Sequence, residues 1–157
     1  YDIALRIGQG SWPGVEAKVL FEIYITPVCS PEFAAKHHLT NLAQISQVPL
    51  IDLSNMDDVW RRWSQRVGID EITSQEHLAF NNYDYAMRAA EQGLGLALAM
   101  LPIESQALKS GKLVAPFAVR TKYEQDMYAV YRSEDKTRHD IRCFLDWLID
   151  SPQLQTN

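Results

Sequence analysis

The sequence predicts an α/β fold, because short apolar segments typical of strands alternate with amphipathic helical segments through the middle of the chain. Glycine and proline residues separate many of these segments, as expected at turns between short elements. The 157 residues are 46% hydrophobic and 22% charged, which is enough to bury a core. Such alternation favours a mostly parallel sheet covered by helices, with ligands bound beyond the carboxyl ends of the strands.

The first half of the chain predicts three strands and three helical segments. The strands are Ile3–Gly8, Val19–Val28 and Pro49–Leu53, and the helical segments are Pro31–Lys36, Leu39–Ser46 and a helix from Asp57 and Asp58 to Val67. Ser30 before Pro31 is an N-cap followed by a proline at the first helical position. Pro27 fits poorly in a central strand, so the second strand is expected to pass from one region to another near Tyr24–Pro27.

The second half continues the alternation. The strands are His77–Phe80, Leu94–Met100 and Met127–Tyr131, and the helices are Tyr83–Gln92, Pro102–Lys109 and Arg138–Ile149. Asn81 or Asn82 can cap the first of these helices, and Gly93 ends it. The last helix is expected to bury one side, formed by Ile141, Phe144, Leu145 and Leu148. Two strand-to-helix turns, Phe80–Tyr83 and Met100–Ile103, follow predicted strands.

Charge and cysteine content limit the possible functions. The net charge of −5 argues against direct nucleic-acid binding by these residues, and no apolar run has the length of a membrane span. Cys29 and Cys143 are predicted to be buried, reduced thiols, although a disulfide between them is possible. The chain begins inside a predicted strand, so we expect a fragment of a longer protein.

The motifs tested for catalysis or metal binding have simpler explanations. The glycines at positions 8, 10 and 14 lack the spacing of a dinucleotide fingerprint, and the four histidines form no ligand cluster. Cys29 lies at a helix start, which can lower a thiol pKa, but Ser30 already explains that position as a cap. Trp60 and Trp63 are expected in a core, with base stacking as the alternative. We therefore expect no enzyme, no metal site and no cofactor.

Four segments occur in an order that resembles a known family. They are "YDIALRIGQGSWPG", "PVCSPEFAA", "AAEQGLGLALAMLPIESQALKSGKLVAPF" and "FLDWL". Together they resemble the effector-binding domain of LysR-type transcriptional regulators, in the branch that includes the glycine-cleavage activator and the β-lactamase regulator. The resemblance covers nearly the whole chain.

The resemblance implies a two-lobed α/β fold like that of type 2 periplasmic binding proteins, with a small-molecule effector between the lobes. Residues 1–23 and 128–157 would form the first lobe, N-terminally incomplete, and residues 24–127 the second. It further implies a cytoplasmic, dimeric or tetrameric regulator without membrane contact, which binds DNA only through a helix-turn-helix domain absent from this chain. The alternative is a solute-binding protein of a transport system. The effector is not identified.

The resemblance also implies effector-binding residues in both lobes. They are Asn81, Asn82, Tyr83, Met100 and Pro102 in the second lobe, and Arg6, Trp12 and Tyr128 in the first. For the asparagines, capping alone is the alternative, and for Trp12 it is packing on the first lobe. The helix start after Leu101 and Pro102 is expected to offer backbone N–H groups to an anion.

Overall fold

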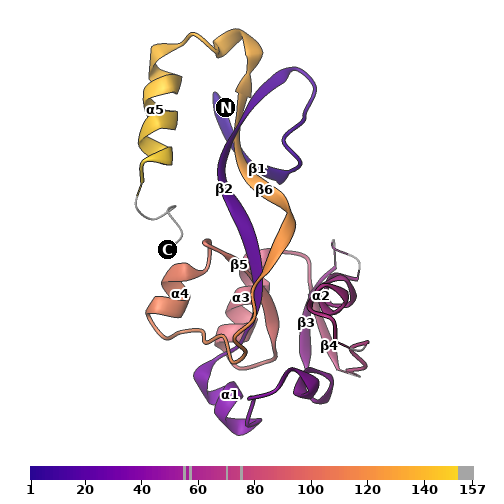
Figure 1. Ribbon diagram of the computed structural model, residues 1–157. Coiled ribbons are helices and arrows are strands. Elements are labelled where there is room, and N and C mark those ends of the chain that lie inside the picture. The colour runs from indigo at the N-terminus through magenta and orange to yellow at the C-terminus, as the bar shows by residue number, and fades with distance from the viewer. Residues whose placement is uncertain (55, 57, 70, 75, 152–157) are drawn as a thin grey trace. The chain divides into compact units, whose positions relative to one another are not determined.

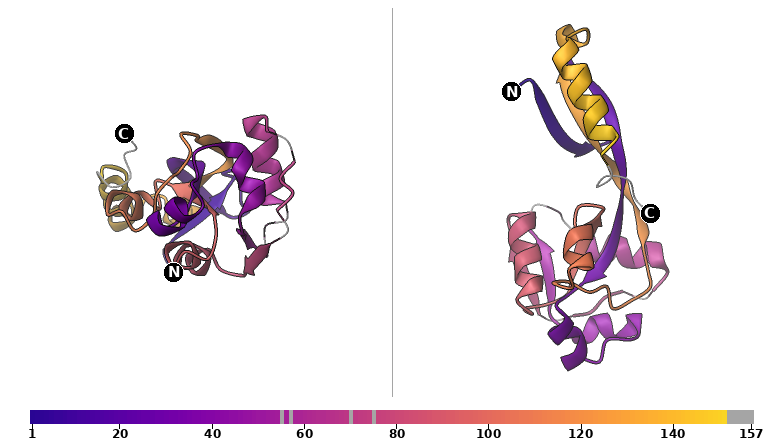
Figure 2. Two further views of the ribbon diagram at one scale, coloured as in Figure 1. Left: turned by 90° about the horizontal axis from the view of Figure 1, so that it is seen from below. Right: turned by 90° about the vertical axis from the view of Figure 1, so that its left-hand side faces the viewer.

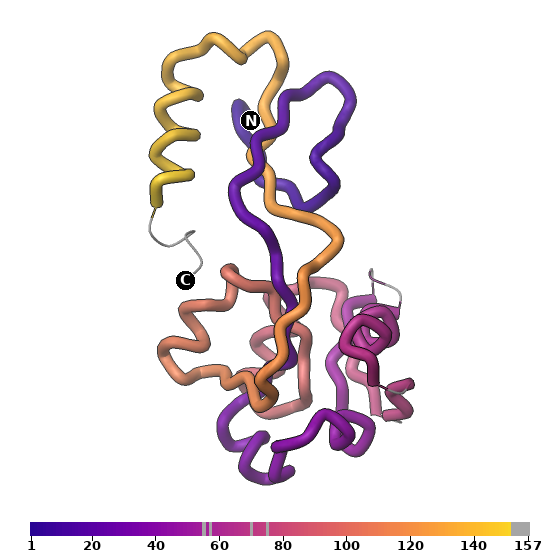
Figure 3. Tube along the Cα trace, viewed as in Figure 1, coloured from indigo at the N-terminus to yellow at the C-terminus, as the bar shows by residue number. Residues whose placement is uncertain are grey.

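The computed structural model describes residues 1–54, 56, 58–69, 71–74 and 76–151 (Figure 1). The chain forms two compact units, with unit 1 made of Tyr1–Tyr24 and Lys122–Asn157 and unit 2 made of Ile25–Thr121. The chain leaves unit 1 within strand β2 (Val15–Val28) and returns within strand β6 (Thr121–Arg132). These two strands run side by side in a sheet of order β1-β6-β2-β5 (Figure 3).

Unit 1 contains strand β1, most of β6, the first part of β2 and one α-helix. Strand β1 (Ile3–Gly8) confirms the predicted first strand and pairs antiparallel with β6. Helix α5 (His139–Ile149) lies along these strands (Figure 2) and buries Ile141 and Leu145 against Ala129. The prediction for Phe144 was wrong: it is 44% exposed, because it lies at the side of the buried face.

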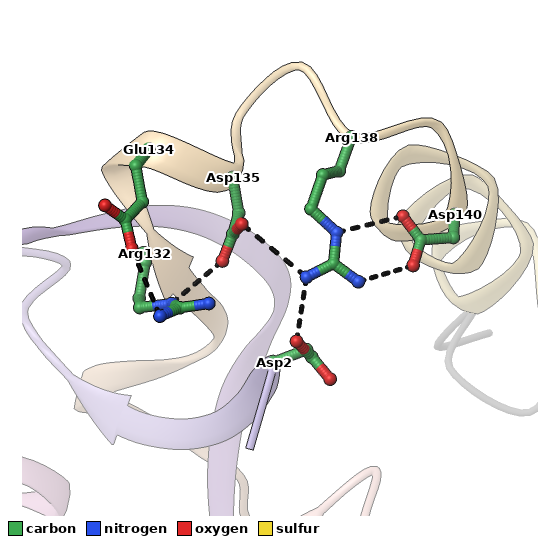
Figure 4. A network of polar contacts seen from close by, with 6 residues as sticks. All are labelled: Asp2, Arg132, Glu134, Asp135, Arg138 and Asp140. Atoms are coloured by element: carbon green, nitrogen blue, oxygen red, sulfur yellow. Dashed lines mark hydrogen bonds and ion pairs between the residues drawn. The ribbon is translucent and has the colours of Figure 1, made fainter.

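A network of ion pairs fixes the start of α5 (Figure 4). The short 3-10 helix η2 (Ser133–Asp135) precedes α5. The buried carboxylate of Asp135 accepts a hydrogen bond from Nε of Arg132 at 2.9 Å. Arg138 contacts Asp2 at 2.8 Å and Asp140 at 2.6 Å, and these bonds lower the pKa of both exposed carboxyls. The network therefore ties the residues before β1 to α5.

Unit 2 contains the parallel part of the fold. Strand β3 (Leu50–Leu53) pairs parallel with β4 (His77–Phe80), and a parallel bridge joins Leu50 to Leu96, just before β5 (Ala97–Leu101). Helix α3 (Tyr83–Glu91) packs on these strands through its alanine-rich face. The core cluster comprises Val28, Ile51, Ala86, Met87, Ala89, Ala90, Ala97, Ala99 and Leu113. The sheets are thus mixed rather than mostly parallel, because β1 and β6 are antiparallel.

Several short helices of unit 2 follow their local signals. Helix α1 (Pro31–Lys36) has the predicted bounds, and the buried Ser30 hydroxyl accepts the N–H of Phe33 at 3.1 Å. The predicted segment Leu39–Ser46 is the 3-10 helix η1 (Leu42–Gln47), which starts later because Asn41 and Gln44 form a capping box.

Helix α2 (Val59–Val67) ends at Gly68 as predicted. Asp57 lies outside the described residues, and Asp58 does not cap the helix with its side chain but pairs with Arg61 at 2.6 Å. Trp60 and Trp63 are 4% and 2% exposed, which confirms their predicted place in the core and excludes base stacking by them.

The predicted helix from Pro102 was too long. Helix α4 covers only Ser105–Lys109, because residues 102–104 form a turn after a cis bond between Leu101 and Pro102. There is therefore no helix start at Pro102, where an anion-binding start was predicted. Nor is any helix within the described ranges long and apolar enough to cross a bilayer.

Candidate functional site

Five of the eight predicted site residues lie at two strand-to-helix turns of unit 2, and we call them the turn cluster. They are Asn81, Asn82, Tyr83, Met100 and Pro102. The first three connect β4 to α3, and the other two lie at the end of β5 and directly after it. Both turns follow strands of the parallel region, where the carboxyl ends of strands offer ligand-binding positions.

A hydrogen bond from one turn to the other holds the turn cluster together. The backbone N–H of Met100 donates to the hydroxyl of Tyr83 over 2.8 Å. Burial, together with the nearby Glu104 carboxylate, raises the pKa of Tyr83 well above its usual value, so the phenol stays protonated. Tyr83 therefore fixes the start of α3 to the end of β5.

The two asparagines have different surroundings. Asn82 is the N-cap of α3, and its side-chain oxygen accepts the N–H groups of Asp84 at 2.8 Å and Tyr85 at 3.4 Å. Asn81 is exposed and has no side-chain hydrogen bond to the residues that the structure describes. The capping alternative thus applies to Asn82, whereas the amide of Asn81 is available to a ligand.

Glu104 lies next to Tyr83 of the turn cluster, and it was not among the site residues predicted from the sequence. Burial raises the pKa of its carboxyl, and a hydrogen bond from Tyr83 partly opposes that shift. No short motif marks this glutamate, although a carboxylate two residues after Pro102, in the turn that follows β5, was a usable signal.

The other three predicted residues meet within unit 1, and we call them the aromatic–arginine cluster. Arg6 of β1 lies directly opposite Tyr128 of β6. The Trp12 ring packs edge-on against Tyr128, with ring centroids 5.6 Å apart, and the guanidinium carbon of Arg6 lies 5.9 Å from the centroid of Trp12. The structure therefore brings together three residues that are up to 122 positions apart, and Trp12 does pack on its own unit.

Two glycines make room for the rings of this cluster. A Cβ atom at Gly8 would lie 2.5 Å from the Trp12 ring, and one at Gly10 would lie 2.8 Å from the Tyr128 hydroxyl. Gly10 also has a φ of 84°, a left-handed conformation that favours glycine. Two of the three glycines without dinucleotide-fingerprint spacing, Gly8 and Gly10, instead allow close aromatic packing.

Both cysteines are free, but only one is buried. Burial raises the pKa of the Cys29 thiol to about 12, which opposes the thiolate that a nucleophile requires. Cys143 is exposed on α5, so the prediction that it is buried was wrong, and its sulfur lies 3.4 Å from Nε2 of His139.

The remaining histidines make structural contacts. The Nδ1 atom of His77 lies 2.5 Å from a carboxylate oxygen of Asp52 across the parallel β3–β4 pair. His37 packs on Phe33 at the end of α1, with ring centroids 4.4 Å apart. Within the described part of the chain, no group of three or more His, Cys, Asp or Glu side chains is arranged to hold a metal ion.

Two hollows on unit 2 lie away from the turn cluster. One, of about 690 Å³, is lined by residues that include Lys36, His37 and Leu94, and another, of about 370 Å³, includes Asp52 and His77. Neither is lined by a residue of the turn cluster.

Two α/β units joined by two long strands, with polar turns beyond parallel strands, define a ligand-binding class of domain. Residues 1–153 match the family described as the LysR substrate binding domain, and the chain belongs to this family. This finding confirms the resemblance seen in the four segments.

Several curated relatives are transcription regulators. The chain is 28% identical over 160 residues to the glycine cleavage system transcriptional activator of Escherichia coli (strain K12). This match covers 94% of this chain and 48% of that protein. It is 31% identical over 151 residues to the transcriptional activator AmpR of Pseudomonas aeruginosa, covering 95% and 49%. The chain thus spans about half the length of the curated relatives it matches, and these matches give no support to the transport alternative.

Solved structures support the same fold. The effector domain of AmpR of Pseudomonas aeruginosa matches with a TM-score of 0.80 and 30% identity, covering 94% of this chain and 70% of that one. The regulatory domain of CrgA from Neisseria meningitidis, at 19% identity, matches with a TM-score of 0.73 and shows the fold alone. The fold is therefore the periplasmic-binding-protein-like α/β fold of LysR effector-binding domains.

Proposed function

We propose that this chain is the effector-sensing domain of a bacterial, cytoplasmic LysR-type transcription regulator. The match of residues 1–153 to the family, and the regulators among its relatives, support this proposal. In the complete protein, DNA would be bound by a part outside these residues, and copies would associate as a dimer or tetramer. Units 1 and 2 would correspond to the two lobes implied by the resemblance.

A sensing domain needs no catalytic group, because a ligand shifts a conformational equilibrium through its different affinities for two states. The observation that carries the proposal is the Tyr83–Met100 hydrogen bond, which joins two strand-to-helix turns into one surface. An effector that contacts this surface touches the start of α3 and the end of β5 at once. It can therefore change how these two elements pack.

The first experiment is a thermal-shift screen of the chain against a metabolite library. A metabolite present at about 100 times its Kd should stabilise the folded state by about 2.7 kcal/mol. The Asn81→Ala variant should lose that stabilisation while melting like the wild type without ligand, because Asn81 makes no cap. If no metabolite stabilises the chain, or if Asn81→Ala responds normally, the proposed site is wrong.

Two variants of Asn82 separate capping from effector contact. Asn82→Ser retains a side-chain oxygen that caps about as well as asparagine, whereas Asn82→Ala costs about 1 kcal/mol of stability. If Asn82 only caps α3, Asn82→Ser binds the metabolite normally. If the amide contacts the effector, Asn82→Ser melts like the wild type but no longer responds.

A further inference from the structure

Helix α5 carries two side chains of metal-ligating types, one turn apart on its exposed surface. His139 is the first residue of the helix and Cys143 follows four positions later, a spacing that places both side chains on one face. Both residues are exposed, whereas the helix buries Ile141 and Leu145 against unit 1. The imidazole and the thiol are therefore open to a dissolved ion.

The donor atoms of this pair lie at a separation that fits one metal ion. Sγ of Cys143 lies 3.4 Å from Nε2 of His139 and 3.8 Å from Nδ1. In a tetrahedral zinc site, a sulfur ligand at about 2.3 Å and a nitrogen ligand at about 2.0–2.1 Å lie about 3.5 Å from each other. Sγ and Nε2 can thus hold one ion with little movement of either side chain.

The pair is not engaged elsewhere in the protein. Across the residues that the structure describes, the side chains of His139 and Cys143 have no polar contact except the one with each other. By contrast, the two ring nitrogens of His77 already face the carboxylate of Asp52 and the carbonyl of Ser74. His139 and Cys143 are therefore free to act as ligands, whereas His77 is not.

The chemistry of the two ligands selects the ion. Imidazole and thiolate are suited to zinc, whereas magnesium and calcium prefer oxygen ligands. Three aspartates and one arginine lie between positions 139 and 150, so the local charge favours a cation. One of these aspartates, Asp146, is exposed and makes only a long pair with Lys18, at 3.5 Å.

We propose that His139 and Cys143 bind a zinc ion on the exposed face of α5. Nε2 of the imidazole donates its lone pair to the ion. The thiol loses its proton to solvent, and its sulfur becomes the second ligand. Water completes the four-coordinate shell, so the site is open and binds more weakly than a closed structural site. The bound ion joins the first two turns of α5 and stabilises the start of the helix.

Titrations with zinc and cobalt chlorides test this site on the reduced, metal-free chain. Zinc should bind with one ion per chain and a Kd of roughly 1–100 µM, because the pair supplies half of the protein ligands of a structural site. Cobalt should give the near-ultraviolet absorption of a cobalt–thiolate bond, and zinc should remove it. Magnesium should leave the absorption unchanged, because a thiolate is a poor ligand for it.

Thiol labelling and matched variants locate the ion. Zinc should slow the labelling of Cys143 about tenfold, and a chelator should restore it. His139→Gln should weaken zinc binding about tenfold, and Cys143→Ser should abolish the cobalt–thiolate band. Arg142→Gln is the control, because it changes another exposed side chain of α5 and should not weaken zinc binding.

Thermal melts check that each variant is folded and provide a second measure of binding. Zinc at about ten times its Kd should raise the Tm of the wild type by roughly 3–6 °C, because it binds the folded pair. The same zinc concentration should leave the Tm of Cys143→Ser unchanged.

Three results would overturn the zinc inference. They are the absence of a cobalt–thiolate band, equal protection of Cys143 by zinc in the wild type and in His139→Gln, and normal zinc binding by both variants, which would place the ion elsewhere. Effector sensing is tested separately by the metabolite screen, and a failure of that screen leaves the zinc site unaffected.

Discussion

Gly95 is the position where a single methyl group should damage unit 2 most directly. The backbone N–H of Leu96 donates to the carbonyl of Pro49 at 2.9 Å, and the N–H of Ile51 donates to the carbonyl of Leu96 at 2.8 Å. These bonds hold β3 against the start of β5. A Cβ atom at Gly95 would lie 2.9 Å from the Pro49 carbonyl oxygen and 3.1 Å from the Ile51 side chain. Gly95→Ala therefore forces backbone segments apart.

The expected cost follows from these contacts. Overpacking a filled core costs about 1–3 kcal/mol, and each strained backbone hydrogen bond adds up to about 1 kcal/mol. We expect Gly95→Ala to lower the free energy of unfolding by about 2–4 kcal/mol. In a chain of this size that corresponds to a fall in Tm of roughly 5–15 °C.

Urea denaturation and thermal melts measure this loss, and hydrogen exchange at the Leu96 and Ile51 amides locates it. Gly68→Asn is the matched control, because Gly68 has a φ of 71° and no neighbour within 4 Å of an added Cβ. Asparagine tolerates that conformation, so this variant should stay within about 0.5 kcal/mol of the wild type. If Gly95→Ala is as stable as Gly68→Asn, the close approach at Pro49 has no energetic weight.

Four further predictions concern other contacts. Ser30→Ala removes the cap of α1 and should cost about 1 kcal/mol in urea denaturation. At pH 8 a thiol reagent should modify Cys143 but not Cys29 in the folded chain, and both in urea; rapid labelling of Cys29 would contradict its burial. Asp135→Asn should destabilise the chain by about 1–2 kcal/mol, less at high salt, and an unchanged melt would show that the network at α5 is dispensable. For Glu104, whose pKa is raised above 4.5, the folded chain keeps a proton that the unfolded chain loses, so stability falls as pH rises through this range. The stability of Glu104→Gln relative to the wild type should therefore increase between pH 4 and pH 7. A fall in its urea midpoint relative to the wild type over this range would refute the prediction.

Local signals predicted the elements that begin and end with special residues. Helix α1 has its predicted bounds because Ser30 caps it and Pro31 fits its first position. Strands β2 and β6 begin four and six residues earlier than predicted, at Val15 and Thr121, because many of these first residues are polar or charged and carry no strand signal. Such half-exposed strands are defined by their partners rather than by their composition.

The candidate site shows the same division between local and long-range information. The sequence predicted a cap for α3 at Asn81 or Asn82, from local signals alone, and the structure places it at Asn82. The meeting of Arg6 with Tyr128 depends instead on the register of β1 against β6, and a slip of one residue would turn one of the two side chains to the opposite face. No pattern near either residue specifies that register. The space at Gly8 and Gly10 has meaning only once the two rings that fill it are in place. Residues that serve one element can therefore be assigned from sequence, whereas residues that join two elements require the fold.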